Sequence, residues 1–253
     1  MLFSIFFAID FQMKAQNSIS VRSIKTPIFH PGDNLYSFLK DHLKKENLDE
    51  KVLAITSKIV SLAENRIVPR SEISKLDLIK KEADIYLGPG GYGSELTLKH
   101  GILIPSSGID ESNAEGDFYI LYPKEPYKSA HDCWLFLKKE FGLTDLALVL
   151  TDSHTTPLRR GVTGISLAHW GFKATRSLIG APDLFGRELK FTHVDLVDAI
   201  ASMAVLSMGE AADGAPLALV SGVQIEYSEG SSADEIKIEP ELDLYRPLLK
   251  EFI

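Results

Sequence analysis

One stretch decides the expected fold: LALVLTDSHTTPLRRGVTG, from Leu146 to Gly164. It opens with an apolar run and then turns polar, which predicts a buried strand over 146–150. The run from Val162 to His169 is strand-like again. We therefore expect Asp152 to lie in a polar turn between two core strands, where carboxylates often serve chemistry.

The polar part of this stretch combines one acid with several hydroxyls and the adjacent pair Arg159 and Arg160. Hard divalent cations take oxygen ligands, and arginine binds phosphate oxygens in a bidentate manner. The combination indicates a site for a cation and for phosphates. The alternative is a solvated loop in which Asp152 accepts hydrogen bonds from its own backbone.

The composition is that of an ordinary soluble globular protein, with 253 residues, 45% hydrophobic and 25% charged. A chain of this length can bury a sizeable core. The formal net charge of −8 argues against nucleic-acid or anionic-membrane binding, because such partners need clustered Lys and Arg. We expect neither as a partner.

The single cysteine and the N-terminus indicate a cytoplasmic protein. Cys133 excludes an internal disulfide, and a buried helix position is expected for it rather than a nucleophile pair with His131. The apolar start, 1–11, is too short to cross a membrane and lacks signal-peptide features. Residues 1–18 are interpreted as an N-terminal extension, either an extra strand or the result of an upstream start before Met13.

Hydrophobic periodicity predicts the remaining elements. Asp33 is expected to cap a helix that runs to about Leu48, and Gly209 is expected to end another as a left-handed cap. The polar pair Ser57-Lys58 directly follows a short strand. The predicted strands are 19–24, 52–56, 96–98, 102–104 and 217–220, and the other predicted helices are 76–83, 127–141 and 194–208.

Two further motifs have competing interpretations. Gly88 to Gly93 matches G-x-G-x-x-G, but strand-like runs follow it, so we do not expect a dinucleotide site. Ser166, with His169 nearby, loosely resembles a nucleophile elbow. A serine hydrolase is therefore an alternative, although Ser166 lies within a strand-like run and no helix follows.

Asp110, Asp152 and Glu210 each stand at the edge of an apolar element. Distant loops of this kind can converge on a pair of metal ions, which would clamp phosphate oxygens during transfer.

The order of motifs from Thr26 to Gly222 resembles the coenzyme F420-0:γ-glutamyl ligase family. The motifs are Thr26-Pro27-Ile28 with Gly32-Asp33, Ser57 to Arg66, Gly108-Ile109-Asp110 with Ser112-Asn113, Asp152-Ser153, Arg160-Gly161, Gly164, Ile179-Gly180, Asp183 to Leu189, Met208-Gly209-Glu210 and Asp213-Gly214.

The resemblance implies an α+β fold of two intertwined subdomains, with mixed sheets flanked by helices. Residues 19–253 would form the catalytic unit, and the protein would be a homodimer. The implied reaction is GTP-dependent addition of L-glutamate to a cofactor carboxylate through an acyl phosphate. Two Mg²⁺ or Mn²⁺ ions would take part, with K⁺ as a further candidate ion.

The resemblance also assigns site residues. One cation would be held by Asp110 and Asp152 and a second by Ser153 and Glu210, with Arg160 joining Asp110 and Asp152 in catalysis. The guanine nucleotide would be bound by Thr26, Pro27, Ile28, Phe29, Ser57, Asn113, Met208, Gly209, Glu210, Ala211, Ala212, Asp213, Gly214 and Ala215.

The chain departs from the family pattern at three places. Leu62 stands where the family carries a lysine, Thr155-Thr156 where it has Gly-Arg, and Ser106-Ser107 where it has Asn-Ala. The acceptor is therefore expected to be either coenzyme F420-0 or a folate-type cofactor. A catalytically silent nucleotide-binding or scaffold homologue is the alternative.

Overall fold

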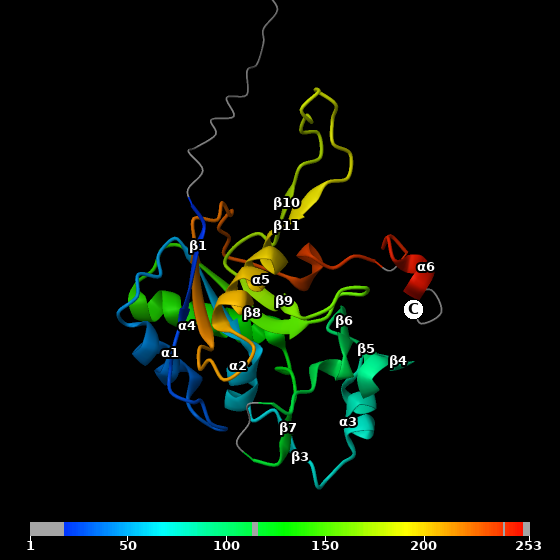
Figure 1. Ribbon diagram of the computed structural model, residues 1–253. Helices are drawn as coiled ribbons and strands as arrows, with labels where there is room; N and C mark the ends of the chain where they lie inside the picture. Colours follow the sequence, from blue (N-terminus) through cyan, green and yellow to red (C-terminus); the bar gives the residue numbers. More distant parts are fainter. Residues whose placement is uncertain (1–17, 113–115, 240, 250–253) are drawn as a thin grey trace, which may run out of the picture.

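The computed structural model describes residues 18–112, 116–239 and 241–249 (Figure 1). Except for Ser18, the predicted N-terminal extension lies outside the described residues, and so does Asn113. The architecture is α+β, as predicted, with a main sheet, several smaller sheets and helices. Within the described part of the chain, no helix combines the length and the apolar character needed to cross a membrane.

The main sheet has five strands in the order β1-β12-β2-β8-β9. Only β2 and β8 run parallel, and the other pairs are antiparallel. Both faces of its centre are covered, which explains the near-continuous apolar runs of these two strands. The strands are β1 (Ser20–Ile24), β12 (Leu217–Ser221), β2 (Lys51–Thr56), β8 (Leu146–His154) and β9 (Thr163–Trp170).

Helices cover the two faces of this sheet (Figure 1). Helices α1 (Leu35–Leu43) and α4 (Pro126–Phe141) pack on the face that includes Leu148. Helix α5 (Leu196–Met208) packs on the opposite face, against Val149. The alternation of Leu148 and Val149 follows from the two-residue period of a strand.

The predicted helix ends need correction. The cap of α1 is Asn34 rather than Asp33, because the Asn34 side chain accepts the Ser37 N–H at 2.9 Å. The Asp33 carboxylate instead accepts the His30 N–H at 2.8 Å, and the helix ends at Leu43, not near Leu48. Gly209 ends α5 with φ 86° and ψ 162°, so it is not the left-handed cap that we predicted.

Between β2 and β8 the chain builds two smaller sheets before it returns to the main one. The Gly88 to Gly93 motif joins two antiparallel strands through a short 3-10 turn, and no α-helix follows it. The dinucleotide interpretation is therefore excluded, as expected. These elements are α2 (Ser57–Ala63), β3 (Ile67–Pro69), α3 (Lys75–Glu82), β4 (Ile85–Pro89), β5 (Glu95–Lys99), β6 (Ile102–Pro105) and β7 (Phe118–Ile120).

Strand β8 extends farther than its apolar run. It pairs through His154, so the prediction that Asp152 lies in a turn was wrong. The physical reason is backbone pairing with β9, where Asp152 lies opposite Ile165 after a bulge near Leu150. Because side chains alternate along a strand, Asp152 and Ser153 point to opposite faces of the sheet.

A long hairpin projects from the body of the molecule (Figure 1). Its base is formed by β10 (Thr175–Ser177) and β11 (His193–Asp195), and residues 178–192 form the arm. The chain then continues through α5 and β12 to a C-terminal segment with α6 (Arg246–Leu249).

Candidate functional site

Asp152 is held by a buried tyrosine on one face of β8. The Tyr122 hydroxyl donates a hydrogen bond to Asp152 Oδ2 at 2.5 Å. Burial raises the pKa of Asp152 to about 6, although the Tyr122 hydroxyl and the Ser153 N–H act in the opposite direction. The nearby Asp110 carboxylate adds to the increase, since like charges disfavour ionisation.

The position of Tyr122 depends on a glycine. Gly108 has a φ of +68°, and a Cβ there would lie 2.0 Å from Tyr122 Cζ, so only glycine fits. The Tyr122 side chain is 3% exposed and the His100 ring stacks on it at 6.4 Å. The glycine of the Gly108-Ile109-Asp110 motif therefore makes room for the ring that orients Asp152.

Asp110 is the second carboxylate near this end of β8. Its Oδ1 accepts the N–H groups of Glu111 at 2.6 Å and Ser112 at 2.7 Å. Its Oδ2 lies 2.5 Å from Lys58 Nζ. Burial acts to raise the pKa of Asp110, but the Lys58 ammonium and the Ser112 groups outweigh it and hold this pKa below its ordinary value.

On the opposite face of β8, Ser153 meets Glu210. The Ser153 hydroxyl lies 2.8 Å from both carboxylate oxygens of Glu210, which follows the C-terminal end of α5. At the preceding Gly209 a Cβ would lie 2.2 Å from Asp213 Oδ2, and this oxygen accepts the Ala211 N–H at 3.1 Å. A hydrogen bond within the loop therefore holds the segment that carries Glu210.

The predicted nucleotide-binding segments come together in part. The Thr26 N–H donates to the Gly214 carbonyl at 3.0 Å, which joins the segments 26–29 and 208–215. Ile28 is exposed, whereas Phe29 packs on Phe38 in the core. Ser57, Met208 and Ala215 are also buried.

Arg160, predicted as a catalytic residue, lies in the exposed loop between β8 and β9. Among the residues that the structure describes, it forms no ion pair. Leu62, at the position of the family lysine, is 4% exposed and belongs to the main core. This position therefore points away from any surface site.

The serine hydrolase alternative fails on geometry. The Ser166 hydroxyl donates to Asp198 at 2.7 Å, while His169 Nδ1 lies 3.2 Å from the Tyr127 hydroxyl, so the serine and histidine do not pair. Cys133 is buried, and burial raises the pKa of its thiol to about 12, which leaves it unreactive.

The two pairs, Asp110 with Asp152 and Ser153 with Glu210, fit partly built cation sites. Mg²⁺ is commonly held by one or two carboxylates, with water and substrate phosphates completing its shell. Within 18–112, 116–239 and 241–249, however, no cluster of three or more His, Cys, Asp or Glu side chains is assembled that could hold a metal ion.

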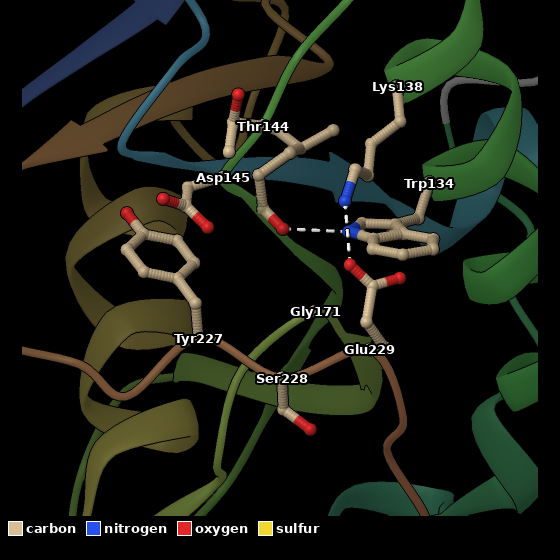
Figure 2. Close-up of a pocket in the computed structure, with 9 residues that line it drawn as sticks. Trp134, Lys138, Thr144, Asp145, Gly171, Tyr227, Ser228 and Glu229 are labelled. Carbon is tan, nitrogen blue, oxygen red and sulfur yellow. Dashed lines mark hydrogen bonds and ion pairs between the residues drawn. The ribbon is translucent and has the colours of Figure 1, made fainter.

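The described part of the chain has two cavities of note, and only one of them is lined by a candidate site residue. A mainly apolar groove of about 450 Å³ opens beside Glu210 and is lined by Val162, Met203 and Leu206, among others. Figure 2 shows the second cavity, of about 110 Å³, next to the first residue of β8. In this cavity Lys138 pairs with Glu229 at 2.9 Å. The cavity lies at the start of β8, whereas Asp152 lies near the other end of the strand.

Sequence reasoning missed Tyr122. Its only local signal is a phenol in an apolar run after β7, and no spacing links it to Asp152. Lys58 was visible as part of a polar pair after a strand, but its contact with Asp110 was not predicted.

Comparison with known proteins identifies a family. A model of the family described as F420-0:Gamma-glutamyl ligase matches residues 23–81 and 78–222. A coenzyme F420:L-glutamate ligase of Methanopyrus kandleri is 32% identical over 238 residues, which cover 85% of this chain and 92% of that protein. Its counterpart in Methanocaldococcus jannaschii is 30% identical, with 92% of this chain and 99% of that protein covered. One from Archaeoglobus fulgidus is 32% identical, with 88% and 94% covered. The chain therefore belongs to the F420-0:γ-glutamyl ligase family.

Proposed function

We propose that the protein is a γ-glutamyl ligase that uses GTP and two divalent cations to add L-glutamate to coenzyme F420-0. The observation that carries this proposal is the end of β8, where Asp152 lies close enough to Asp110 to feel its charge and the Ser153 hydroxyl donates to Glu210. The names of the relatives supply the reaction class, since they are coenzyme F420:L-glutamate ligases.

In this reaction the γ-phosphoryl group of GTP moves to the acceptor carboxylate and GDP leaves. The glutamate amine then attacks the acyl carbon, phosphate leaves, and the amine loses a proton. Divalent cations, when bound, would neutralise the charge on the phosphate oxygens. The chain would mainly position the reactants, and such positioning can contribute about 7 to 11 kcal/mol.

Each part of the site has a proposed task. Asp110 and Asp152 would hold one cation, and Tyr122 would fix the direction of Asp152. Ser153 and Glu210 would hold the second. The joined segments 26–29 and 208–215 would bind the guanine nucleotide, and Arg160 on the β8–β9 loop would bind phosphate.

A folate-type acceptor is the second candidate. The substitutions Thr155-Thr156 lie in the exposed β8–β9 loop, which continues into Val162 at the apolar groove. This departure from the family pattern therefore falls in an exposed loop and leaves Asp110, Asp152, Ser153 and Glu210 unchanged. Such a difference favours a change of acceptor over a loss of the cation sites.

We also propose a homodimer. Support comes from the arm 178–192, which carries Leu184 at 99% and Phe185 at 84% exposure. Large apolar side chains grouped on a projecting segment indicate a surface that another chain covers. Sedimentation of the wild-type chain should give the mass of two copies, and replacing both residues with serine should shift it towards one.

The function is tested by mass spectrometry of incubations with GTP, Mn²⁺ and L-glutamate. Separate tubes receive F420-0, dihydropteroate or dihydrofolate. We expect a glutamyl mass gain in the F420-0 tube, while a gain only with a folate-type compound would establish the second candidate. No gain in any tube, together with no stabilisation by GTP and Mn²⁺, would support the silent homologue. Free ligand at about 100 times its Kd should stabilise the folded chain by about 2.7 kcal/mol.

A further inference from the structure

Lys58 lies at the edge of the site for a topological reason. It follows β2, which runs parallel to β8 and pairs Thr56 with Thr151. The first residues after β2 therefore lie beside Asp152. From there the Lys58 side chain, 22% exposed, reaches across to the Asp110 loop.

The contacts of Asp110 leave one oxygen for a cation. Oδ1 accepts two backbone N–H groups, whereas Oδ2 contacts the Lys58 ammonium at 2.5 Å. A divalent ion that binds Asp110 in the plane of the carboxylate therefore competes with Lys58 for Oδ2. The displaced ammonium keeps a second partner, the Ser112 carbonyl at 2.9 Å, and so would stay near the site.

Other bases are poorly placed for the same task. Leu62 lies in the core, so the position of the family lysine offers none here. Among the described residues, Lys58 is the only base that forms an ion pair with Asp110, Asp152, or Glu210. Lysine is a compact charge on a flexible stem, which suits it to exchange one anionic partner for another.

We propose that Lys58 is a resident counter-ion of Asp110 that the divalent cation displaces, and that the freed ammonium then binds the terminal phosphates of the nucleotide. This inference rests on the proposed function. Lys58 keeps Asp110 neutralised while the cation is absent, and its ammonium is free to take an anionic partner once the cation has bound.

The test is Lys58→Met, which removes the charge and keeps an unbranched side chain. Mn²⁺ affinity without nucleotide, followed by electron paramagnetic resonance of free Mn²⁺, should rise about three- to tenfold because the competitor is gone. The affinity for GTPγS in the presence of Mn²⁺ should fall about ten- to a hundredfold, because a charge-assisted contact is lost. Opposite changes in the two affinities are the signature that a merely structural lysine would not produce.

The matched control is Lys75→Met. Lys75 pairs with Glu111, next to Asp110 in sequence, so this variant removes the same charge close by without freeing Asp110. We expect at most a twofold change in either affinity. Lys58→Arg should restore most of the nucleotide affinity, and a thermal midpoint without ligands checks that each variant folds.

The outcomes separate the inference from the proposed function. A wild-type chain that binds neither Mn²⁺ nor GTPγS overturns the function and the inference with it. If the wild type binds both, unchanged affinities in Lys58→Met overturn the inference alone. A loss of both affinities in that variant also overturns it, because Lys58 would then only support the fold of the site.

Discussion

The neighbouring strands β8 and β9 each contribute to a polar cluster, and the two clusters differ in how many of their hydrogen bonds are made within the protein. At the end of β8, Asp152 and Glu210 receive hydrogen bonds from one hydroxyl each, from Tyr122 and Ser153. Along β9, Ser166 gives both its N–H and its hydroxyl to Asp198. The same residue types thus make an open site in one place and a closed structural cluster in the other.

The burial of the two groups explains the difference. Ser166 is fully buried, so its polar atoms need protein partners, and Asp198 accepts from both of its donors. Ser153 is half-buried and Glu210 is exposed beside a groove, where solvent or a ligand can complete its contacts. We therefore expect changes on β8 to act on activity and changes on β9 to act on stability.

The largest expected effect is that of Asp152→Asn. The amide can still accept the Tyr122 hydrogen bond but carries no charge for a cation, so kcat should fall at least about a hundredfold. The thermal midpoint without ligands should stay near the wild-type value. Asp145→Asn, at the other end of β8, is the matched control and should keep full activity. Full turnover by Asp152→Asn would sink the assignment of Asp152 as a cation ligand.

Next is Tyr122→Phe, which removes only the hydroxyl that orients Asp152. Groups that orient a ligand typically cost about 10- to 100-fold in metal affinity when lost, and we expect a loss in this range for Mn²⁺. Tyr86→Phe is the control, because Tyr86 also donates to a carboxylate, that of Glu95, but far from β8 in sequence. Equal Mn²⁺ affinities for the two variants would contradict the orienting role.

For the cluster at β9, Asp198→Ala on the neighbouring helix α5 should destabilise the fold by about 1 to 3 kcal/mol, because two donors of buried Ser166 lose their acceptor. Urea unfolding measures this. The double variant Asp198→Ala with Ser166→Ala should recover part of the loss, since one orphaned donor is removed. Turnover per folded molecule should stay close to wild type. A large loss of turnover would contradict a purely structural role for this cluster.

The smallest expected effect concerns pH. Burial lowers the pKa of His169 to about 4, against an ordinary value near 6.5, while Glu235 and Asp198 act to raise it. Between these values the unfolded chain binds more protons than the folded one. The stability that neutral His169 provides is therefore fully present above about pH 6.5 and declines as the pH falls towards 4. His169→Gln should flatten this part of the curve of unfolding free energy against pH, and an unchanged slope would argue against the lowered pKa.

Local patterns predicted the cores of the elements well. The apolar run 146–150 and the amphipathic repeat of 127–141 correspond to β8 and α4. The end of β8 was not predictable, because Asp152 belongs to the strand only through its pairing with Ile165. The cap of α1 was misplaced by one residue because Asp33 and Asn34 are both good capping residues.

Sequence motifs predicted some residues of the candidate site but not their partners. Motif order pointed to Asp110, Asp152, Ser153 and Glu210; in the structure Ser153 contacts Glu210, and the charge of Asp110 acts on Asp152. The partners that tune them come from distant parts of the chain: Tyr122 is 30 residues from Asp152, and Lys58 is 54 residues from Ser112. Such contacts depend on tertiary packing and leave no spacing in the sequence.

The central claim is that the end of β8 serves two cations, one on each face of the strand. The most direct measurement is the number of Mn²⁺ ions bound per chain in the presence of GTPγS, for the wild type, Asp152→Asn and Glu210→Gln. We predict two ions for the wild type and one for each variant. Two ions retained in both variants, or none bound by the wild type, would contradict this account.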